Sequence, residues 1–278
     1  MSKVCSVHPR KLWRVESEGK EMQELSTKDR VMREIRKGVR RLTGRSAEAD
    51  EGRRDYSEKT LELFAKVAPY TMTSNPRIHA VERSIRYIVE ANIPGDIVEC
   101  GVWRGGSSMA AAHTLMDAGD TSRVLWLFDT FDGMPKPTKK DLSWTGSDAM
   151  RRWTREADGS DKGSKWLRVD IEEVRQNLNS TGYPSDKITL TKGMVQDTLP
   201  GNNVGDISLL RLDTDFYEST KIELELLWPK LSRGGVLIVD DYGRWLGQRE
   251  AVDAFFKEQN LPILLSRIDE YGYMAQKL

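Results

Sequence analysis

The sequence is poor in cysteine, and this scarcity excludes two kinds of stabilisation. Only two cysteines occur in 278 residues, Cys5 and Cys100. A disulfide framework needs several cysteine pairs, and a structural zinc site needs about four Cys or His ligands. We therefore expect two free thiols.

The chain also lacks an excess of charge of either sign and any long apolar run. Its 43 Lys and Arg residues balance 43 Asp and Glu residues, so no overall field attracts nucleic acid or an anionic membrane surface. No apolar run reaches the ~20 residues of a membrane-spanning helix, and the N-terminus has no apolar core of a signal peptide. We expect a cytoplasmic protein with a small-molecule partner, and neither a nucleic acid nor a membrane as partner.

The length of 278 residues suits one large domain with a small extension. Residues 1–55 are highly charged, and their apolar residues recur at helical spacing. We expect a charged helical N-terminal extension whose apolar face packs on the main domain or on a second copy of the chain. The alternative is that its basic stretch, residues 33–41, contacts an acidic partner or a membrane. We also expect a homo-oligomer.

Residues 56–278 alternate short β-rich runs with helical segments, which predicts an α/β fold. Several runs are almost continuously apolar, as in strands that are covered on both faces, so we expect a doubly wound, mainly parallel sheet. The last two runs predict a hairpin that adds a C-terminal antiparallel strand. The expected strands are DIVEC (96–100), VLWLFD (124–129), KITLTKG (187–193), ISLLRLD (207–213), GGVLIVDD (234–241), PILLSRID (262–269) and GYMAQKL (272–278).

One connection is unusually long and polar. Residues 132–165 separate an expected strand from an expected helix and contain few apolar side chains. Connections of this length are uncommon unless they serve a site or are disordered. The two interpretations are a lid over a site and a disordered insertion.

Acidic residues mark the ends of the expected strands. Glu99, Asp129, Asp213, Asp240 and Asp241 occupy these positions. In a doubly wound sheet, ligands bind outside the carboxyl ends of the strands, so we expect these carboxylates to converge on one edge. Each acid taken alone is also compatible with a helix cap or a surface position.

The turn after the first strand contains glycines and serines that suit a nucleoside cofactor. Gly101, Gly105 and Gly106 allow a tight turn under a ligand, and Ser107 or Ser108 is available to cap the next helix. An acid at the end of the second strand is placed to bind ribose hydroxyls. The spacing of these glycines differs from the G-x-G-x-x-G pattern of dinucleotide sites. This difference favours S-adenosylmethionine over NAD as the cofactor. A purely structural turn is the alternative.

A second set of acids predicts a metal site. Asp213, Asp240 and Asp241 offer hard oxygen ligands with no Cys or His nearby in the sequence, which favours Mg²⁺ over zinc. A divalent cation relieves their mutual repulsion and lowers the pKa of a bound hydroxyl. The alternative is that acids in these stretches cap the following helices, with Asp215 and Glu218 the best candidates.

At these residues the sequence resembles the macrocin O-methyltransferase family. The resemblance covers about residues 60–278, and its most specific stretches are ECGVWRGG (99–106), RLDTDFYEST (211–220) and VDDYG (239–243). It implies a methyltransferase domain of Rossmann-like type over residues 56–278. It also implies that S-adenosylmethionine and Mg²⁺ serve the methylation of sugar hydroxyls in antibiotic biosynthesis.

The resemblance assigns roles to individual residues. It implies that Asp213, Asp240 and Asp241 hold the metal and that Asp213 is the general base. The residues implied to line the cofactor site are Glu99, Cys100, Gly101, Val102, Trp103, Ser108 and Asp129.

These observations support one function and leave two alternatives. The favoured function is Mg²⁺-dependent methyl transfer to a hydroxyl of a glycosylated or diol-bearing small molecule. The first alternative acceptor is a catechol-like phenol, which also presents two neighbouring oxygens to a metal. The second alternative is a noncatalytic S-adenosylmethionine-binding assembly protein, against which the three converging acids argue.

Overall fold

The structure of the protein is a computed structural model that describes residues 55–278. The helix expected within residues 1–55 lies outside these residues. The described chain from Ser57 onward forms one compact unit.

A seven-stranded sheet forms the centre of this unit, with the strand order β3-β2-β1-β4-β5-β7-β6. Neighbouring strands from β3 to β5 are parallel, whereas β7 runs antiparallel to both β5 and β6. This confirms the doubly wound, mainly parallel sheet and its C-terminal antiparallel strand. The strands are β1 Asp96–Cys100, β2 Leu125–Asp129, β3 Ile188–Lys192, β4 Ile207–Leu212, β5 Leu231–Val239, β6 Ser266–Arg267 and β7 Tyr273–Gln276.

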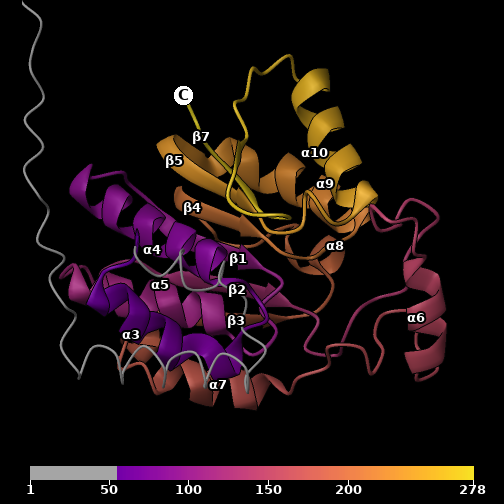
Figure 1. The fold of residues 1–278 in the computed structure, drawn as a ribbon, viewed down its shortest axis with the longest axis horizontal. Helices are drawn as coiled ribbons and strands as arrows, with labels where there is room; N and C mark the ends of the chain where they lie inside the picture. The colour runs from indigo at the N-terminus through magenta and orange to yellow at the C-terminus, as the bar shows by residue number, and fades with distance from the viewer. Residues whose placement is uncertain (1–54) are drawn as a thin grey trace, which may run out of the picture. The chain divides into compact units, whose positions relative to one another are not determined.

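Helices cover both faces of the sheet (Figure 1). One layer contains α3, α4, α5 and α7, and the other contains α8, α9 and α10. No helix among residues 55–278 is long and apolar enough to cross a membrane. The α-helices are α3 Glu58–Val67, α4 Asn75–Glu90, α5 Gly106–Asp117, α6 Ala149–Glu156, α7 Ile171–Asn179, α8 Val195–Thr198, α9 Tyr217–Leu227 and α10 Leu246–Glu258, and three short 3₁₀ helices are η2 Ala68–Tyr70, η3 Ser185–Lys187 and η4 Trp228–Lys230.

The strand register explains which side chains reach which layer. Every residue of β4 is buried, as expected for a central strand covered on both faces. Cys100 and Leu212 are register partners and belong to the same apolar cluster as Leu224 of α9. Glu99 and Arg211 are also register partners, one residue earlier on each strand, so they project to the opposite face, towards α4 and α5.

The long polar connection is ordered and packs against the sheet unit. It contains α6, and its backbone forms hydrogen bonds with the start of α10 and the residues just before it. The Trp144 amide donates to the Arg244 carbonyl (2.8 Å), and the Leu246 amide donates to the Leu142 carbonyl (2.8 Å). Gly133, Met134 and Pro135 of this connection line a pocket. The structure therefore favours the interpretation that residues 132–165 form a wall that covers a site, and it excludes the interpretation as a disordered insertion.

Asp141 ties this wall to the start of α9. Its wholly buried carboxylate accepts hydrogen bonds from the Thr138 amide (2.6 Å) and from the Tyr217 amide (2.8 Å), which opens α9. The N-cap residue of α9 is Phe216, and no side chain next to it in sequence caps the helix. The expectation that Asp215 or Glu218 caps this helix is therefore wrong, because a carboxylate from a distant segment already occupies that position.

Removing this cap is expected to destabilise the fold. Asp141→Ala leaves the partly buried Tyr217 amide without its acceptor and removes the wholly buried carboxylate, and it should lower the free energy of unfolding by about 2 kcal/mol in urea titrations. Asp170→Ala is the matched control, because Asp170 caps α7 at the exposed Glu172 amide, where water replaces the lost bond. Equal losses in the two variants would contradict a buried tether at Asp141.

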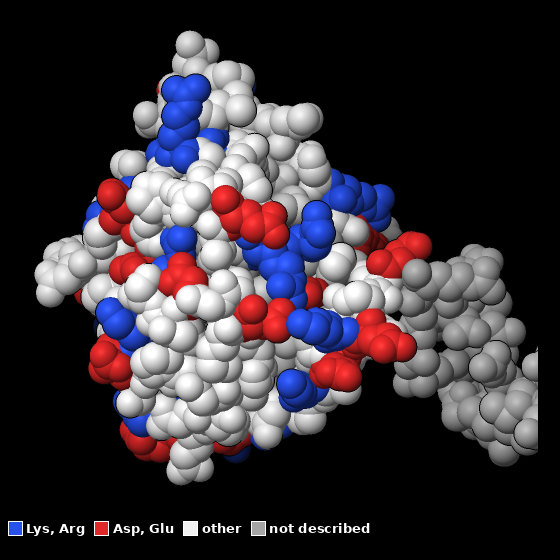
Figure 2. Space-filling model, turned by 90° about the vertical axis from the view of Figure 1, so that its left-hand side faces the viewer, with Lys and Arg blue, Asp and Glu red and all other residues white. Residues whose placement is uncertain are grey.

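Charged side chains of both signs are interspersed on the surface. Figure 2 shows Lys and Arg beside Asp and Glu across one face. Many form exposed pairs, such as Lys59 with Asp117 (3.2 Å) and Lys162 with Asp197 (2.8 Å). Exposed pairs of this kind contribute little to stability. The charges that bear on function are therefore the buried ones around the pocket.

Candidate active site

A pocket lies at the carboxyl ends of the parallel strands. The loops after β1, β2, β3, β4 and β5 all contribute to its lining. Ligands bind at this edge in open α/β sheets. The lining residues from these five loops are Gly101, Val102, Trp103, Asp129, Thr130, Gly193, Met194, Val195, Gln196, Asp213, Thr214, Asp215, Asp240 and Asp241.

The loop after β1 requires glycine for two separate reasons. Gly101 has φ of +84°, and a Cβ there would lie 2.1 Å from the Asp213 carbonyl oxygen, so this loop crosses the loop after β4 in direct contact. Gly105 has φ of +88° and is the N-cap residue of α5. The expectation that Ser107 or Ser108 caps this helix is therefore wrong, because the left-handed backbone places the cap at a glycine before them.

Asp129 holds this glycine loop in place. One of its carboxylate oxygens accepts hydrogen bonds from the amides of Val102 (2.7 Å) and Trp103 (3.0 Å), and the other accepts one from the Phe131 amide (2.8 Å). Trp103 itself has a positive φ of 48°, so the loop depends on these bonds for its shape. A carboxylate offers about four lone-pair sites, which leaves capacity for a ligand hydroxyl.

Loss of Asp129 is expected to weaken nucleoside binding. Asp129→Ala removes both the acceptor that faces the pocket and the anchor of the glycine loop, so we expect at least ~10-fold weaker binding of S-adenosylhomocysteine in calorimetry. Asp132→Ala, a neighbouring acid that does not line the pocket, is the control. Unchanged affinity in Asp129→Ala, or binding of NAD in place of S-adenosylhomocysteine, would contradict the cofactor assignment.

Three residues expected to line the cofactor site lie behind the lining of the pocket. Glu99, Cys100 and Ser108 are buried and are not part of the pocket lining. Glu99 forms a buried ion pair with Arg211 and accepts a hydrogen bond from Ser108 of α5. Cys100 faces the other layer, and burial raises the pKa of its thiol. Glu99 therefore contacts the site through Arg211.

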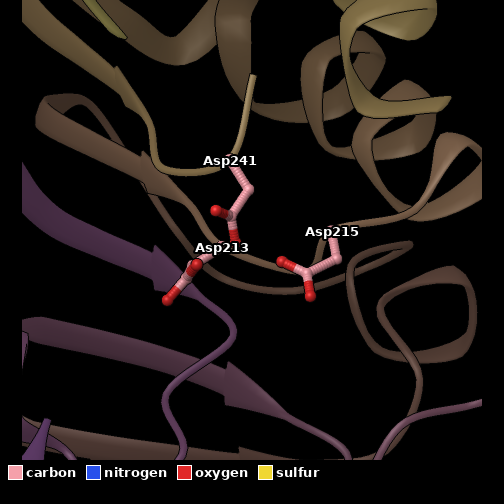
Figure 3. Close-up of side chains that lie close together, drawn as sticks. All are labelled: Asp213, Asp215 and Asp241. Atoms are coloured by element: carbon pink, nitrogen blue, oxygen red, sulfur yellow. The ribbon is translucent and has the colours of Figure 1, made fainter. Parts of the chain in front are cut away.

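Three carboxylates converge in the pocket (Figure 3). Asp213 and Asp215 follow β4, and Asp241 follows β5; one oxygen from each lies within 4.8 Å of the others. Asp215 is buried and has φ of 70°, a left-handed conformation that is unusual for a residue with a side chain. That conformation turns its carboxylate towards the other two.

Burial and mutual repulsion disfavour charge on these acids. Burial raises the pKa of Asp213, Asp215 and Asp241, and the charges of neighbouring carboxylates raise it further, although a hydrogen bond with Asp215 lowers the pKa of Asp241. Arg211 opposes this effect at Asp213, and Arg244 opposes it more weakly at Asp215. Converging acids of this kind are stabilised by a cation, and an all-oxygen donor set suits Mg²⁺.

Asp240 occupies a different position from the other predicted ligands. Its carboxylate lies between two arginines, with an ion pair to Arg77 and a separation of 2.6 Å from Arg211 Nη2. Its side chain is only 3% exposed. The structure therefore brings Asp213 and Asp241 of the predicted metal set together, adds Asp215 to them, and places Asp240 against arginine side chains.

An aromatic cluster forms the opposite side of the pocket. The ring centroids of Trp166 and Trp245 are 6.3 Å apart, and Phe216 packs edge-on against Trp245. The Arg152 guanidinium lies 4.4 Å from the Trp166 ring centre, and the Arg244 guanidinium lies over the Trp245 ring, 5.9 Å from its centre. Apolar rings next to the acids provide a partly apolar and partly polar surface, as is typical of pockets that bind small molecules.

Sequence reasoning found Trp103 but missed the arginines and the other two tryptophans of the pocket. Arg77, Arg211, Trp166 and Trp245 come from four separate elements, and no short motif links them. One signal was present for Arg211, a single charge within the otherwise apolar run ISLLRL. A charge in a buried strand requires a buried partner, and Glu99 supplies it.

The family comparison matches nearly the whole chain. The family described as Macrocin-O-methyltransferase (TylF) matches residues 8–277. The match therefore includes most of the charged segment before residue 56, which the resemblance in sequence motifs did not cover.

Known relatives and solved structures agree with this match. The chain is 38% identical over 207 residues to 8-demethyl-8-(2,3-dimethoxy-alpha-L-rhamnosyl)-tetracenomycin-C 4'-O-methyltransferase of Streptomyces olivaceus, covering 73% of this chain and 74% of that protein. It is 32% identical over 208 residues to demethyldecarbamoylnovobiocin O-methyltransferase of Streptomyces niveus, covering 75% and 76%. The solved structure of the O-methyltransferase NovP superposes with a TM-score of 0.65 at 31% identity, covering 75% of this chain and 82% of that one.

The fold, the pocket and the comparisons lead to the same assignment. The Rossmann-like sheet order places a glycine loop and a carboxylate cluster at one edge of the sheet. The family match covers almost the full length of the chain. The chain belongs to the macrocin O-methyltransferase family, and it is an O-methyltransferase.

Proposed function

We propose that this enzyme transfers the methyl group of S-adenosylmethionine to a hydroxyl of a sugar or of a sugar-bearing natural product, and that the reaction depends on Mg²⁺. The observation that carries the proposal is the convergence of Asp213, Asp215 and Asp241 in the same pocket as the glycine loop. The similarity to enzymes named as methylating a rhamnosyl tetracenomycin and a novobiocin precursor supports the acceptor class.

The donor is proposed to bind on the β1 side of the pocket. Gly101, Val102 and Trp103 supply a closely packed backbone there, and Asp129 supplies acceptor capacity for ribose hydroxyls. Helix α5 starts at Gly106 in the pocket wall, and its first amides have no partner within the helix. Such amides favour a carboxylate, which the amino-acid part of the donor carries.

Asp213 and Asp241 are proposed to hold the metal. Both belong to the set expected from the sequence and to the cluster that the structure assembles. A bound Mg²⁺ would lower the pKa of a coordinated hydroxyl and orient it. The third anionic ligand is either Asp215, because it lies close to Asp213 and Asp241, or Asp240, because the sequence pattern predicts it. The variants described in the Discussion distinguish the two residues.

A carboxylate of the cluster is proposed to accept the hydroxyl proton. The family resemblance implies Asp213, which lies 3.0 Å from Arg211 Nη2. Among the described residues Asp215 forms no ion pair within 4 Å, and its pKa is raised by burial and by Asp241. A carboxylate without a paired cation is the stronger base, so the contacts favour Asp215.

The decisive experiment measures methyl transfer by the purified protein. Labelled S-adenosylmethionine is incubated with a panel of rhamnosides, an aglycone series and catechol, after EDTA treatment and again after Mg²⁺ add-back. We expect label on a glycoside, loss of turnover with EDTA and recovery with Mg²⁺. Preference for catechol would instead support the phenol alternative.

Two outcomes would reject the proposal. Full turnover in metal-free enzyme would show that the reaction does not depend on a metal. Binding of S-adenosylmethionine with no transfer to any acceptor, in the panel or in cell extracts, would favour the noncatalytic assembly protein. The homo-oligomer, the cytoplasmic location and the role of residues 1–55 stay predictions.

A further inference from the structure

A chain of buried charges lies directly behind the carboxylate cluster. Arg211 is central to it, with a side chain that is only 4% exposed on the middle strand β4. Its Nη1 bonds to Glu99 of β1, and its Nη2 lies 3.0 Å from Asp213 Oδ2 and 2.6 Å from Asp240 Oδ1. One guanidinium thus joins the ends of three adjacent strands.

Arg77 of α4 extends this chain on the far side. It pairs with Asp240, lies 3.7 Å from Asp241 Oδ1, and its Nε bonds to Asp269 Oδ2 at 3.0 Å. Asp240 is therefore enclosed between two cations. The two residues proposed to hold the metal, Asp213 and Asp241, each contact one of these arginines.

The geometry points to Arg211 as a positioning residue for the metal site: we propose that its Nη2, which pairs with both Asp213 and Asp240 while Nη1 bonds to Glu99, fixes the two acids relative to β1, so that Asp213 presents an oxygen to the ion. This inference rests on the proposed metal-dependent function. The planar fork of the side chain suits the task because a guanidinium engages several carboxylates in one plane, whereas an ammonium acts as a point charge. Glu99 holds the guanidinium from behind, and its own second oxygen bonds to Ser108.

Charge and position make opposite predictions about cation binding. A positive side chain near a cation site repels the ion, so removing it would tighten binding if charge alone mattered. A residue that orients a ligand has the opposite effect, because partners of metal ligands typically contribute 10–100-fold to affinity. The sign of the change therefore distinguishes the two roles.

The test is Mn²⁺ binding to the full-length protein, measured by calorimetry and by electron paramagnetic resonance. Arg211→Lys keeps the charge and loses the fork, and Arg211→Gln loses both. We expect both variants to bind Mn²⁺ at least ~10-fold more weakly than the wild type while they still bind S-adenosylhomocysteine. Unchanged or tighter Mn²⁺ binding in either variant would overturn the inference.

Two further variants separate positioning from general stability. Arg123→Lys is the matched control, because Arg123 is a largely buried arginine (11% side-chain exposure) paired with Asp120 at the opposite ends of the strands. It should lower the melting temperature and leave Mn²⁺ affinity unchanged. Thr73→Val removes a single contact to Arg211 Nη2 (3.1 Å) from a partly exposed loop, so it tests the inference if the Arg211 variants do not fold.

We expect Thr73→Val to weaken Mn²⁺ binding about 2–5-fold, in line with the loss of one hydrogen bond. Unchanged affinity in a folded Thr73→Val protein would count against a positioning role. If the wild-type protein binds no Mn²⁺, the proposed function fails. If the wild type binds Mn²⁺ and the Arg211 variants match it, only this inference fails.

Discussion

Asp213→Asn and Asp241→Asn are each expected to lower kcat at least ~100-fold while S-adenosylhomocysteine affinity stays near that of the wild type. Each variant replaces an anionic oxygen of the carboxylate cluster by a neutral amide, which weakens the bound cation. Both substitutions change a side chain only, so the backbone contact between Asp213 and Gly101 of the glycine loop is kept. Metal-dependent turnover and Mn²⁺ affinity are the measurements.

Asp215→Asn and Asp240→Asn assign the remaining roles. If Asp215 is the base, its variant keeps Mn²⁺ affinity and loses roughly 10²–10⁴-fold in kcat. If Asp215 is instead the third ligand, Mn²⁺ affinity falls together with kcat. Asp240→Asn should lower the melting temperature strongly, because it leaves Arg77 and Arg211 without their shared partner.

Asp161→Asn is the control for this series. Asp161 lies in the polar wall, where its exposed carboxylate pairs with Lys136. Its loss should change neither kcat nor Mn²⁺ affinity. If Asp213→Asn and Asp241→Asn behave like this control, the cluster is not a metal site.

Glu223→Gln is expected to stabilise the protein at alkaline pH. Glu223 is wholly buried on α9, and burial raises its pKa to about 8, partly offset by a hydrogen bond from Thr214 Oγ1 (2.8 Å). Because the native carboxyl holds a proton that the unfolded chain releases near pH ~4.5, folding becomes less favourable as the pH rises through this interval. From about pH 5 to about pH 8 the loss should reach roughly 3 kcal/mol.

Glutamine resembles the protonated acid and does not titrate, so the variant should lose this slope. The measurement is the free energy of unfolding in urea at several pH values for the wild type and Glu223→Gln. Their difference should be small near pH ~5 and grow towards pH ~8. Glu225→Gln, an exposed acid on the same helix, is the control. Parallel pH profiles for wild type and Glu223→Gln would show that Glu223 is ionised in the folded protein.

The position of Glu223 also relates to the site. Its hydrogen-bond donor, Thr214, stands between Asp213 and Asp215 in the loop after β4. The second carboxyl oxygen of Glu223 has no hydrogen-bond partner within residues 55–278. Since the neutral variant keeps the acceptor for Thr214, we expect Glu223→Gln to preserve Mn²⁺ affinity.

Local patterns in the chain were sufficient for the fold and for the location of the site. Apolar runs with β-rich composition identified the parallel strands, because strands buried on both faces need apolar side chains along their whole length. The same patterns placed Asp129, Asp213 and Asp241 at strand ends, and parallel strands bring their carboxyl ends to one edge. The pocket forms at that edge.

The partners of these acids depended on contacts between residues far apart in the chain. Asp240 and Asp241 are adjacent in sequence, yet one is enclosed by Arg77 and Arg211 and the other faces the cluster. Asp141 caps a helix that starts 76 residues later. Spacing along a chain specifies which residues share a strand or a helix face, whereas the direction of each side chain at a loop depends on backbone angles and on the neighbours that fill the space around it. Only the packed structure contains that information.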